Sequence, residues 1–113
     1  MAYVYATSLA YDAATGLALG RESEAAGSCF GQYVVGVCYE EGCGGVAQDY
    51  AEAVRLYSLA AAQGHAYAQN NLGLMFENGE GVAQDRAEAI RWYRLAAAQG
   101  NAYATAALQQ LGA

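Results

Sequence analysis

A 24-residue segment occurs twice in this sequence in nearly identical form. Residues 45–68 read GVAQDYAEAVRLYSLAAAQGHAYA, and residues 81–104 read GVAQDRAEAIRWYRLAAAQGNAYA. The copies start 36 residues apart and differ at only five positions. Duplicated segments adopt similar structures, and a repeat period between about 20 and 50 residues is typical of solenoids, in which each unit packs on the next. The sequence therefore predicts an array of stacked units.

Weaker copies of the repeat extend toward the N-terminus. Residues 34–42 align with residues 71–79, and residues 12–27 align with residues 49–64, although Gly20 stands where Tyr57 stands in the better copy. We therefore expect a degenerate N-terminal repeat or capping helix over residues 1–27. The array itself is expected over residues 28–113, as units 28–64 and 65–100 and a partial unit 101–113. Because about three repeats are needed for stability, a longer parent array is also an expectation.

The second half of each unit has the pattern of an amphipathic helix, expected over residues 48–63 and 84–99. Apolar residues recur at three- and four-residue spacings, as the set Ala53, Tyr57, Ala60 and Ala61 illustrates. Asp49 with Glu52, and Asp85 with Glu88, resemble capping boxes at the helix start. Arg55 and Arg91 follow these glutamates by three residues and are expected to pair with them on the solvent side. Gly64 and Gly100 are expected to end these helices, because glycine readily adopts the left-handed conformation just past a helix end.

The first half of each unit also predicts a helix, which begins after a capping residue and ends near Glu77 or Asn78 in the middle copy. Ser28, His65 and Asn101 occupy equivalent capping positions. In the middle copy the expected inward stripe is Ala68, Leu72, Met75 and Phe76. Gly36 and Gly73 lie at equivalent positions inside these helices, and a close approach of the neighbouring helix is the expected reason.

Composition agrees with helices and limits the possible partners. The chain has no Pro and a formal charge of −6, from 11 acidic residues against 5 basic ones. Such an acidic balance disfavours nucleic-acid binding. Neither a membrane span nor a signal peptide is visible, so a cytoplasmic location is favoured. Cys29, Cys38 and Cys43 have no metal-binding spacing and are expected to be reduced thiols.

The residue pattern that recurs in successive units resembles the Sel-one-like repeat (SLR), a relative of the tetratricopeptide repeat. The resemblance runs from about Gly27 to Leu111. It implies a right-handed α/α superhelix of antiparallel helix pairs in which the first helix of each pair lines the concave side. Members of that family serve as scaffolds or adaptors for other proteins. The positions that carry the pattern in the better copy are Ala68, Leu72, Gly73, Phe76, Gly79, Gly81, Val82, Asp85, Ala89, Trp92, Tyr93, Ala96, Ala97 and Gly100.

If the first helices line a groove, the residues opposite their inward stripe become candidate partner contacts. Tyrosine rings supply contact area, and amide side chains can bond a peptide backbone. Burial between neighbouring helices is the alternative for several of them, and Asn70 and Asn71 are the preferred candidates. The predicted groove residues are Tyr33, Val37, Tyr67, Asn70, Asn71, Leu74 and Glu77, and the same stripe also includes Phe30, Val34, Glu40, Tyr103, Ala106 and Gln110.

No catalytic, metal or cofactor site is predicted. His65 is the only histidine and is better explained as a helix cap, while Asp49 and Asp85 are too regularly spaced to form a cluster. The leading hypothesis is an all-α protein-interaction scaffold, not an enzyme, that binds a neutral or basic polypeptide. A self-associating structural module is one alternative. A secreted hydrolase, as proposed for some relatives, is another and would require a pocket around His65 or a reactive cysteine.

Overall fold

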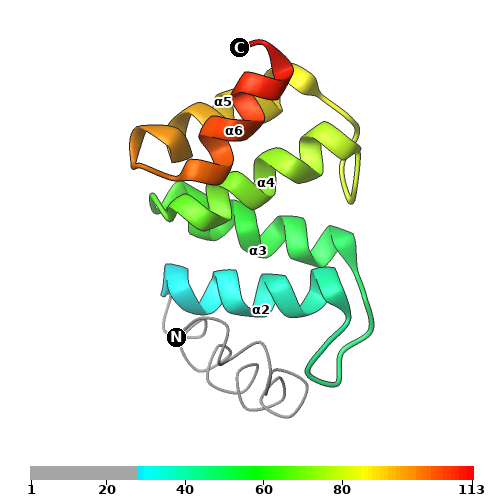
Figure 1. Cartoon of the computed structure of the whole chain (residues 1–113). Helices are drawn as coiled ribbons and strands as arrows, with labels where there is room; N and C mark the ends of the chain where they lie inside the picture. The colour runs from blue at the N-terminus through cyan, green and yellow to red at the C-terminus, as the bar shows by residue number, and fades with distance from the viewer. Residues whose placement is uncertain (1–27) are drawn as a thin grey trace.

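The computed structural model describes residues 28–113, which form helices connected by short loops (Figure 1). Within these residues there is no strand, and the predicted all-α class is confirmed. The degenerate repeat expected over residues 1–27 lies outside the described part of the chain. The helices are α2 (Cys29–Glu41), α3 (Tyr50–Ala62), α4 (Ala66–Asn78), α5 (Arg86–Ala98) and α6 (Ala102–Leu111).

The helices form antiparallel pairs that stack in chain order (Figure 1). The most extensive contacts join α2 to α3 and α4 to α5, and smaller contacts join α3 to α4 and α5 to α6. A main core cluster forms where α2, α3 and α4 meet, around Tyr57, Leu72 and Met75. A second cluster lies between α5 and α6, around Tyr93 and Ala104. This is the arrangement of a helical solenoid of tetratricopeptide type.

Each helix begins directly after the residue that the sequence predicts as its N-cap. Asp49 Oδ1 accepts a hydrogen bond from the Glu52 amide at 3.1 Å, and Asp85 does the same for Glu88. Helices α3 and α5 therefore start at Tyr50 and Arg86, two residues later than expected. Caps of the other helices also match the prediction, and they are Ser28, His65 and Asn101.

The reciprocal half of the predicted capping boxes is replaced by an ion pair. Both carboxylate oxygens of Glu52 accept from Arg55, at 3.0 and 2.7 Å, and Glu88 pairs with Arg91 in the same way. The expected pairing of these residues is confirmed. Because the bonds satisfy the carboxylates and both pairs are solvent-exposed, their contribution to stability is small.

The two inner glycines accommodate aromatic rings. A Cβ atom at Gly36 would stand 2.8 Å from the Tyr57 ring, and one at Gly73 would stand 2.8 Å from the Tyr93 ring. Both tyrosines are completely buried. The predicted close approach is confirmed, and its cause is the ring of a tyrosine from the following helix.

A glutamine ladder, which the sequence did not reveal, joins the first helices to the ends of the second helices. Gln63 Nε2 donates to Gln32 Oε1 at 2.8 Å, and Gln99 Nε2 donates to Gln69 Oε1 at 2.9 Å. Gln69 Nε2 in turn donates to the Ala61 carbonyl. Gln32 and Gln69 are both buried, so these bonds satisfy polar groups that water does not reach.

Cys29, Cys38 and Cys43 form no disulfide with one another in the structure. Cys38 is buried in a small cluster with Val35 and Leu56, and Cys43 packs against that cluster from the following loop. Cys29 is half-buried and packs against the main core. Their shared role in this structure is to fill space as small apolar side chains.

Candidate functional site

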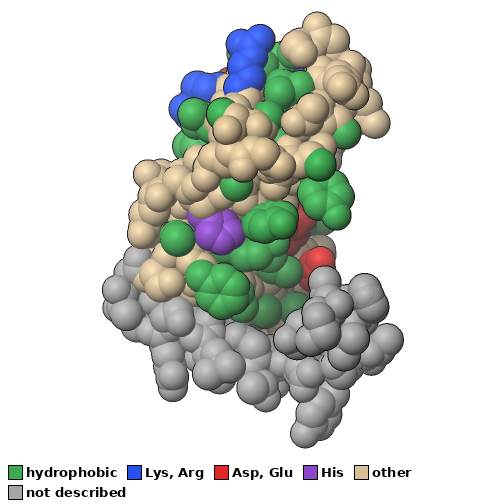
Figure 2. Space-filling view, turned by 60° about the vertical axis from the view of Figure 1, so that its left-hand side comes forward, with side chains coloured by type: hydrophobic (Ala, Val, Ile, Leu, Met, Phe, Trp, Pro, Cys, Tyr) green, Lys and Arg blue, Asp and Glu red, His purple; other side chains and the backbone are tan. Residues whose placement is uncertain are grey.

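The accessible residues of α2, α4 and α6 form one surface, which we call the A face. Figure 2 shows hydrophobic side chains gathered around the histidine, with carboxylates beside them and arginine side chains at the far end of the molecule. All seven predicted groove residues belong to α2 or α4, and their exposure differs widely. The A face is therefore the candidate interaction surface.

Three large aromatic side chains occupy the same position in successive first helices. Phe30, Tyr67 and Tyr103 each stand two residues after the helix cap. Their exposed fractions are 61%, 53% and 71%. We call these three residues the aromatic row. A ring that the core does not need, repeated in every unit and left open to solvent, is a feature typical of contact surfaces.

The seam between α2 and α4 is filled by aromatic rings. The Tyr33 ring stacks on the His65 ring with centroids 4.8 Å apart, and it lies 6.1 Å from the Tyr67 ring and 6.0 Å from the Tyr57 ring. Burial raises the pKa of the Tyr33 hydroxyl, and the nearby Asn71 side chain offsets part of that rise. Tyr33 and Asn71 are thus half-buried parts of this seam.

His65 serves as a helix cap, as predicted. Its Nδ1 accepts a hydrogen bond from the Ala68 amide at 3.1 Å, which requires that nitrogen to be unprotonated. Burial lowers the pKa of His65 and so favours the neutral ring. The geometry explains His65 by capping and by stacking on Tyr33.

Two predicted groove residues have structural partners that the sequence did not indicate. Asn70 is only 6% exposed, and its Nδ2 lies 3.5 Å from Asn71 Oδ1, so it stands less free on the surface than expected. Glu77 Oε1 accepts a 2.6 Å hydrogen bond from the Tyr93 hydroxyl. Val37 is half-buried and packs against the main core. Of the predicted set, Tyr67 and Leu74 are the most exposed, at 53% and 38%.

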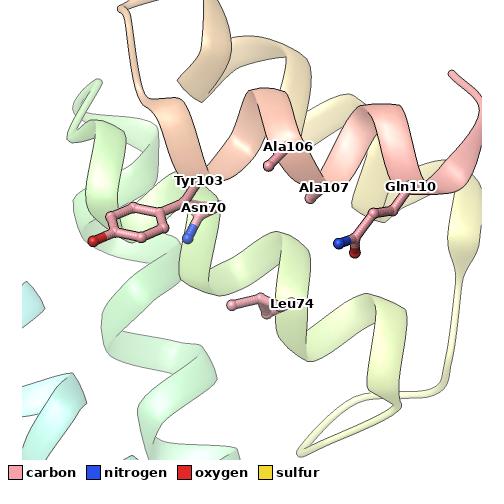
Figure 3. Close-up of a pocket in the computed structure, with 6 residues that line it drawn as sticks. All are labelled: Asn70, Leu74, Tyr103, Ala106, Ala107 and Gln110. Atoms are coloured by element: carbon pink, nitrogen blue, oxygen red, sulfur yellow. The ribbon is translucent and has the colours of Figure 1, made fainter.

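A pocket opens to solvent between α4 and α6 (Figure 3). Its volume is about 250 Å³. Tyr103 and Asn70 lie together at one end, Gln110 lies at the other, and Leu74 faces Ala106 and Ala107 across it. None of these six residues carries a charge, so the pocket offers apolar walls with a few hydroxyl and amide groups. The helical spacing predicted that Asn70, Leu74, Tyr103, Ala106 and Gln110 share one surface, but it did not predict the pocket.

Two consecutive segments, residues 30–65 and 66–101, match the family model described as the Sel1 repeat. The chain belongs to the Sel1 repeat family. Sel1 repeat proteins are generally helical modules for protein interaction, and their fold is typically non-catalytic. The predicted resemblance to this family is thereby confirmed.

Solved Sel1 repeat proteins have the same fold as this chain. A Sel1 repeat protein from Oxalobacter formigenes is 39% identical, with a TM-score of 0.74, over 78% of this chain and 36% of its own. The protective antigen c5321 of uropathogenic Escherichia coli, which displays an SLR fold, is 39% identical, with a TM-score of 0.77, over 85% of this chain and 22% of its own. This chain therefore spans about a third or less of those proteins. A comparison with curated proteins finds no significant match.

Metal-binding clusters and membrane-spanning helices are both absent from residues 28–113. Across residues 28–113, no group of three or more His, Cys, Asp or Glu residues is placed to hold a metal ion. None of the helices in that range combines the length and apolar character needed to cross a bilayer. The feature of this Sel1 repeat chain that still needs a functional explanation is the exposed A face.

Proposed function

We propose that this Sel1 repeat chain is a scaffold that binds a segment of another polypeptide along the A face. The observation that carries the proposal is the aromatic row, whose rings are each more than half exposed although the core is well filled. Exposed aromatic side chains supply contact area at low entropic cost. Their repetition along the solenoid suits an extended partner that contacts one unit after another.

The charges of the helices support a neutral or basic partner. Helices α2, α4 and α6 contain three carboxylates and no Arg or Lys, whereas α3 and α5 contain four arginines and two carboxylates. Complementary potentials favour association and suppress acidic competitors. The carboxylates of the first set are Glu40, Glu41 and Glu77, and the arginines of the second set are Arg55, Arg86, Arg91 and Arg94.

A peptide-display selection on the immobilised chain tests the proposal. Selected peptides should bind the wild type and lose affinity for the double variant Tyr67→Ala/Tyr103→Ala. Leu95→Ala is the matched control, because Leu95 is 42% exposed but belongs to α5, outside the A face. Peptides that bind all three proteins equally would refute the A face as the binding surface.

Self-association is a second candidate function, favoured by a different surface. Leu59 and Leu95 occupy equivalent positions on α3 and α5, and both are 42% exposed. A row of apolar side chains on the second helices could contact another copy of the chain. Sedimentation velocity at two concentrations tests this: a sedimentation coefficient that rises with concentration, and falls back in Leu59→Asp/Leu95→Asp, would support it.

A further inference from the structure

The pocket between α4 and α6 arises where successive units of the repeat differ. In the α2–α4 seam the Tyr33 ring stacks on His65. The residues at the equivalent positions of the α4–α6 seam are Asn70 and Asn101, so two rings are replaced by two shorter amides. The repeat otherwise keeps its backbone geometry, since the caps and glycine turns recur. Because the backbone geometry is the same and the side chains are shorter, the α4–α6 seam contains empty volume that larger side chains fill in the α2–α4 seam.

A second pair of replacements enlarges the same space. Asn70 and Asn71 of α4 correspond to Ala106 and Ala107 of α6, and both alanines line the pocket. The aromatic wall is kept, because Tyr103 corresponds to Tyr67. One wall of the pocket is therefore Tyr103, a member of the aromatic row. Another is formed by Ala106 and Ala107, where the α2–α4 seam has two asparagines.

We infer that this pocket receives one uncharged aliphatic side chain of a basic peptide segment. This inference rests on the proposed function and names the partner's chemistry. A volume of about 250 Å³ lies below the range typical of sites for drug-sized ligands, and it suits a single side chain. The lining contains no charged group that would repay the desolvation of a charged side chain.

The groups around the pocket supply the rest of the recognition. The exposed amide of Gln110 stands at one end and can bond the backbone beside the inserted residue, whereas the Asn70 amide at the other end is largely covered and donates to Asn71. Glu77 lies one turn beyond Leu74 on α4, and its carboxylate accepts from the Tyr93 hydroxyl. One cation reaches the end of α6, because Arg86 donates to the Leu111 carbonyl at 2.6 Å. The first helices contain no arginine or lysine and the chain carries a net charge of −6, so the overall field favours cationic residues next to the inserted side chain.

Titration of the ¹⁵N-labelled full chain with capped synthetic peptides tests the inference by NMR. The probe is Gly-Arg-Gly-Leu-Gly-Arg-Gly, compared with peptides in which Asp or Gly replaces Leu, or Ser replaces both Arg residues. The Leu peptide should shift the signals of Leu74, Tyr103 and Gln110 and bind at least about tenfold tighter than the Asp and Gly peptides, as expected for burial of one leucine. Replacing Arg by Ser should weaken binding at low salt.

Variants that fill the pocket provide the control. Ala106→Leu, and Ala106→Asn as the residue of the preceding unit, should each remove the preference for Leu over Gly. Ala106 is exposed, so both variants should fold. Ala98→Leu adds the same side chain at an exposed position of α5 and should leave the preference unchanged.

Three results would overturn the inference. If all peptides shift A-face signals equally and Ala106→Leu has no effect, the pocket does not select a side chain, although the proposed function stands. If no peptide shifts these signals, the inference fails, and the display selection decides the proposed function separately. If the pocket signals shift with protein concentration alone, without any peptide, the occupant is a second copy of the chain.

Discussion

The hydroxyl of Tyr93 donates a 2.6 Å hydrogen bond to Glu77 Oε1, from the middle of one unit's second helix to the end of its first. Tyr57 makes the same bond to Glu40 in the preceding unit, also at 2.6 Å. Burial raises the pKa of both tyrosines, and the carboxylates raise it further, so the phenols remain donors. In each unit, the tyrosine–glutamate hydrogen bond therefore connects a buried ring of the core to a carboxylate at the acidic end of the A face.

Removal of the Tyr93 ring should destabilise the chain strongly. Tyr93 is fully buried, so Tyr93→Ala leaves a large cavity and should lower the free energy of unfolding by about 3 kcal/mol or more. Tyr93→Phe keeps the ring and loses only the bond to Glu77, which should cost about 1 kcal/mol. Urea denaturation followed by circular dichroism measures both values. Equal stability of wild type and Tyr93→Ala would contradict the assigned core.

Gly73→Ala has two opposing effects on stability, a steric clash and a gain in helix propensity. Alanine is favoured over glycine in helices by about 1 kcal/mol, but its Cβ would stand 2.8 Å from the Tyr93 ring. Overpacking of this kind costs about 1–3 kcal/mol, and we expect the variant to be less stable. Thermal unfolding decides the sign. A gain in stability would show that the ring moves aside at little cost, and that close packing does not explain the glycine.

The stability of the chain should fall as the pH drops through the range in which His65 titrates. Burial holds the pKa of folded His65 below its ordinary value of about 6.5. The unfolded state therefore binds more protons between the two pKa values, so the contribution is complete above pH 6.5 and decreases below it. Urea midpoints measured from about pH 7.5 to 5.5 test this.

His65→Asn is the matched control for that pH dependence. Asn101 already caps α6 by accepting from the Ala104 amide at 2.9 Å, so asparagine can perform this role in the same fold. The variant should keep the cap and lose the decrease in stability between pH 7.5 and 5.5. An identical pH profile for wild type and His65→Asn would assign the dependence to another group.

The glutamine ladder should contribute to stability through Gln69. Gln69 is 4% exposed, accepts from Gln99 and donates to the Ala61 carbonyl, so it joins two units. Gln69→Leu leaves both partners unsatisfied and should cost about 1–3 kcal/mol. Gln109→Leu, at an exposed position of α6, is the control and should have little effect. Equal unfolding midpoints for the two variants would show that the ladder is not a stabilising contact.

Local signals and near-identity of the copies explain why the sequence predicted the helices and their caps. Asp49 and His65 act on amides three residues away, so their roles depend on adjacent sequence alone. The carboxylate partner of Tyr57 is 17 residues away, and the glutamine partners are about 30 residues apart, so those bonds depend on how the helices pack.

The candidate site was less accessible to sequence reasoning than the fold. Helical spacing placed Tyr67, Asn70 and Leu74 on one face, but spacing does not give exposure, and Asn70 is largely covered. The pocket depends on differences between units, such as Ala106 in place of Asn70, whereas repeat analysis emphasises what the units share. Side-chain size across a seam, rather than periodicity, was the signal that could have revealed it.

The dissociation constant of a display-selected peptide, measured by calorimetry for wild type, Tyr67→Ala/Tyr103→Ala and Leu95→Ala, tests the proposed scaffold most directly. Because exposed rings at contact surfaces commonly contribute more than about 1 kcal/mol each, the double variant should bind at least about tenfold more weakly. Leu95→Ala should bind like the wild type. Equal affinity for wild type and the double variant, or a loss confined to Leu95→Ala, would contradict binding on the A face.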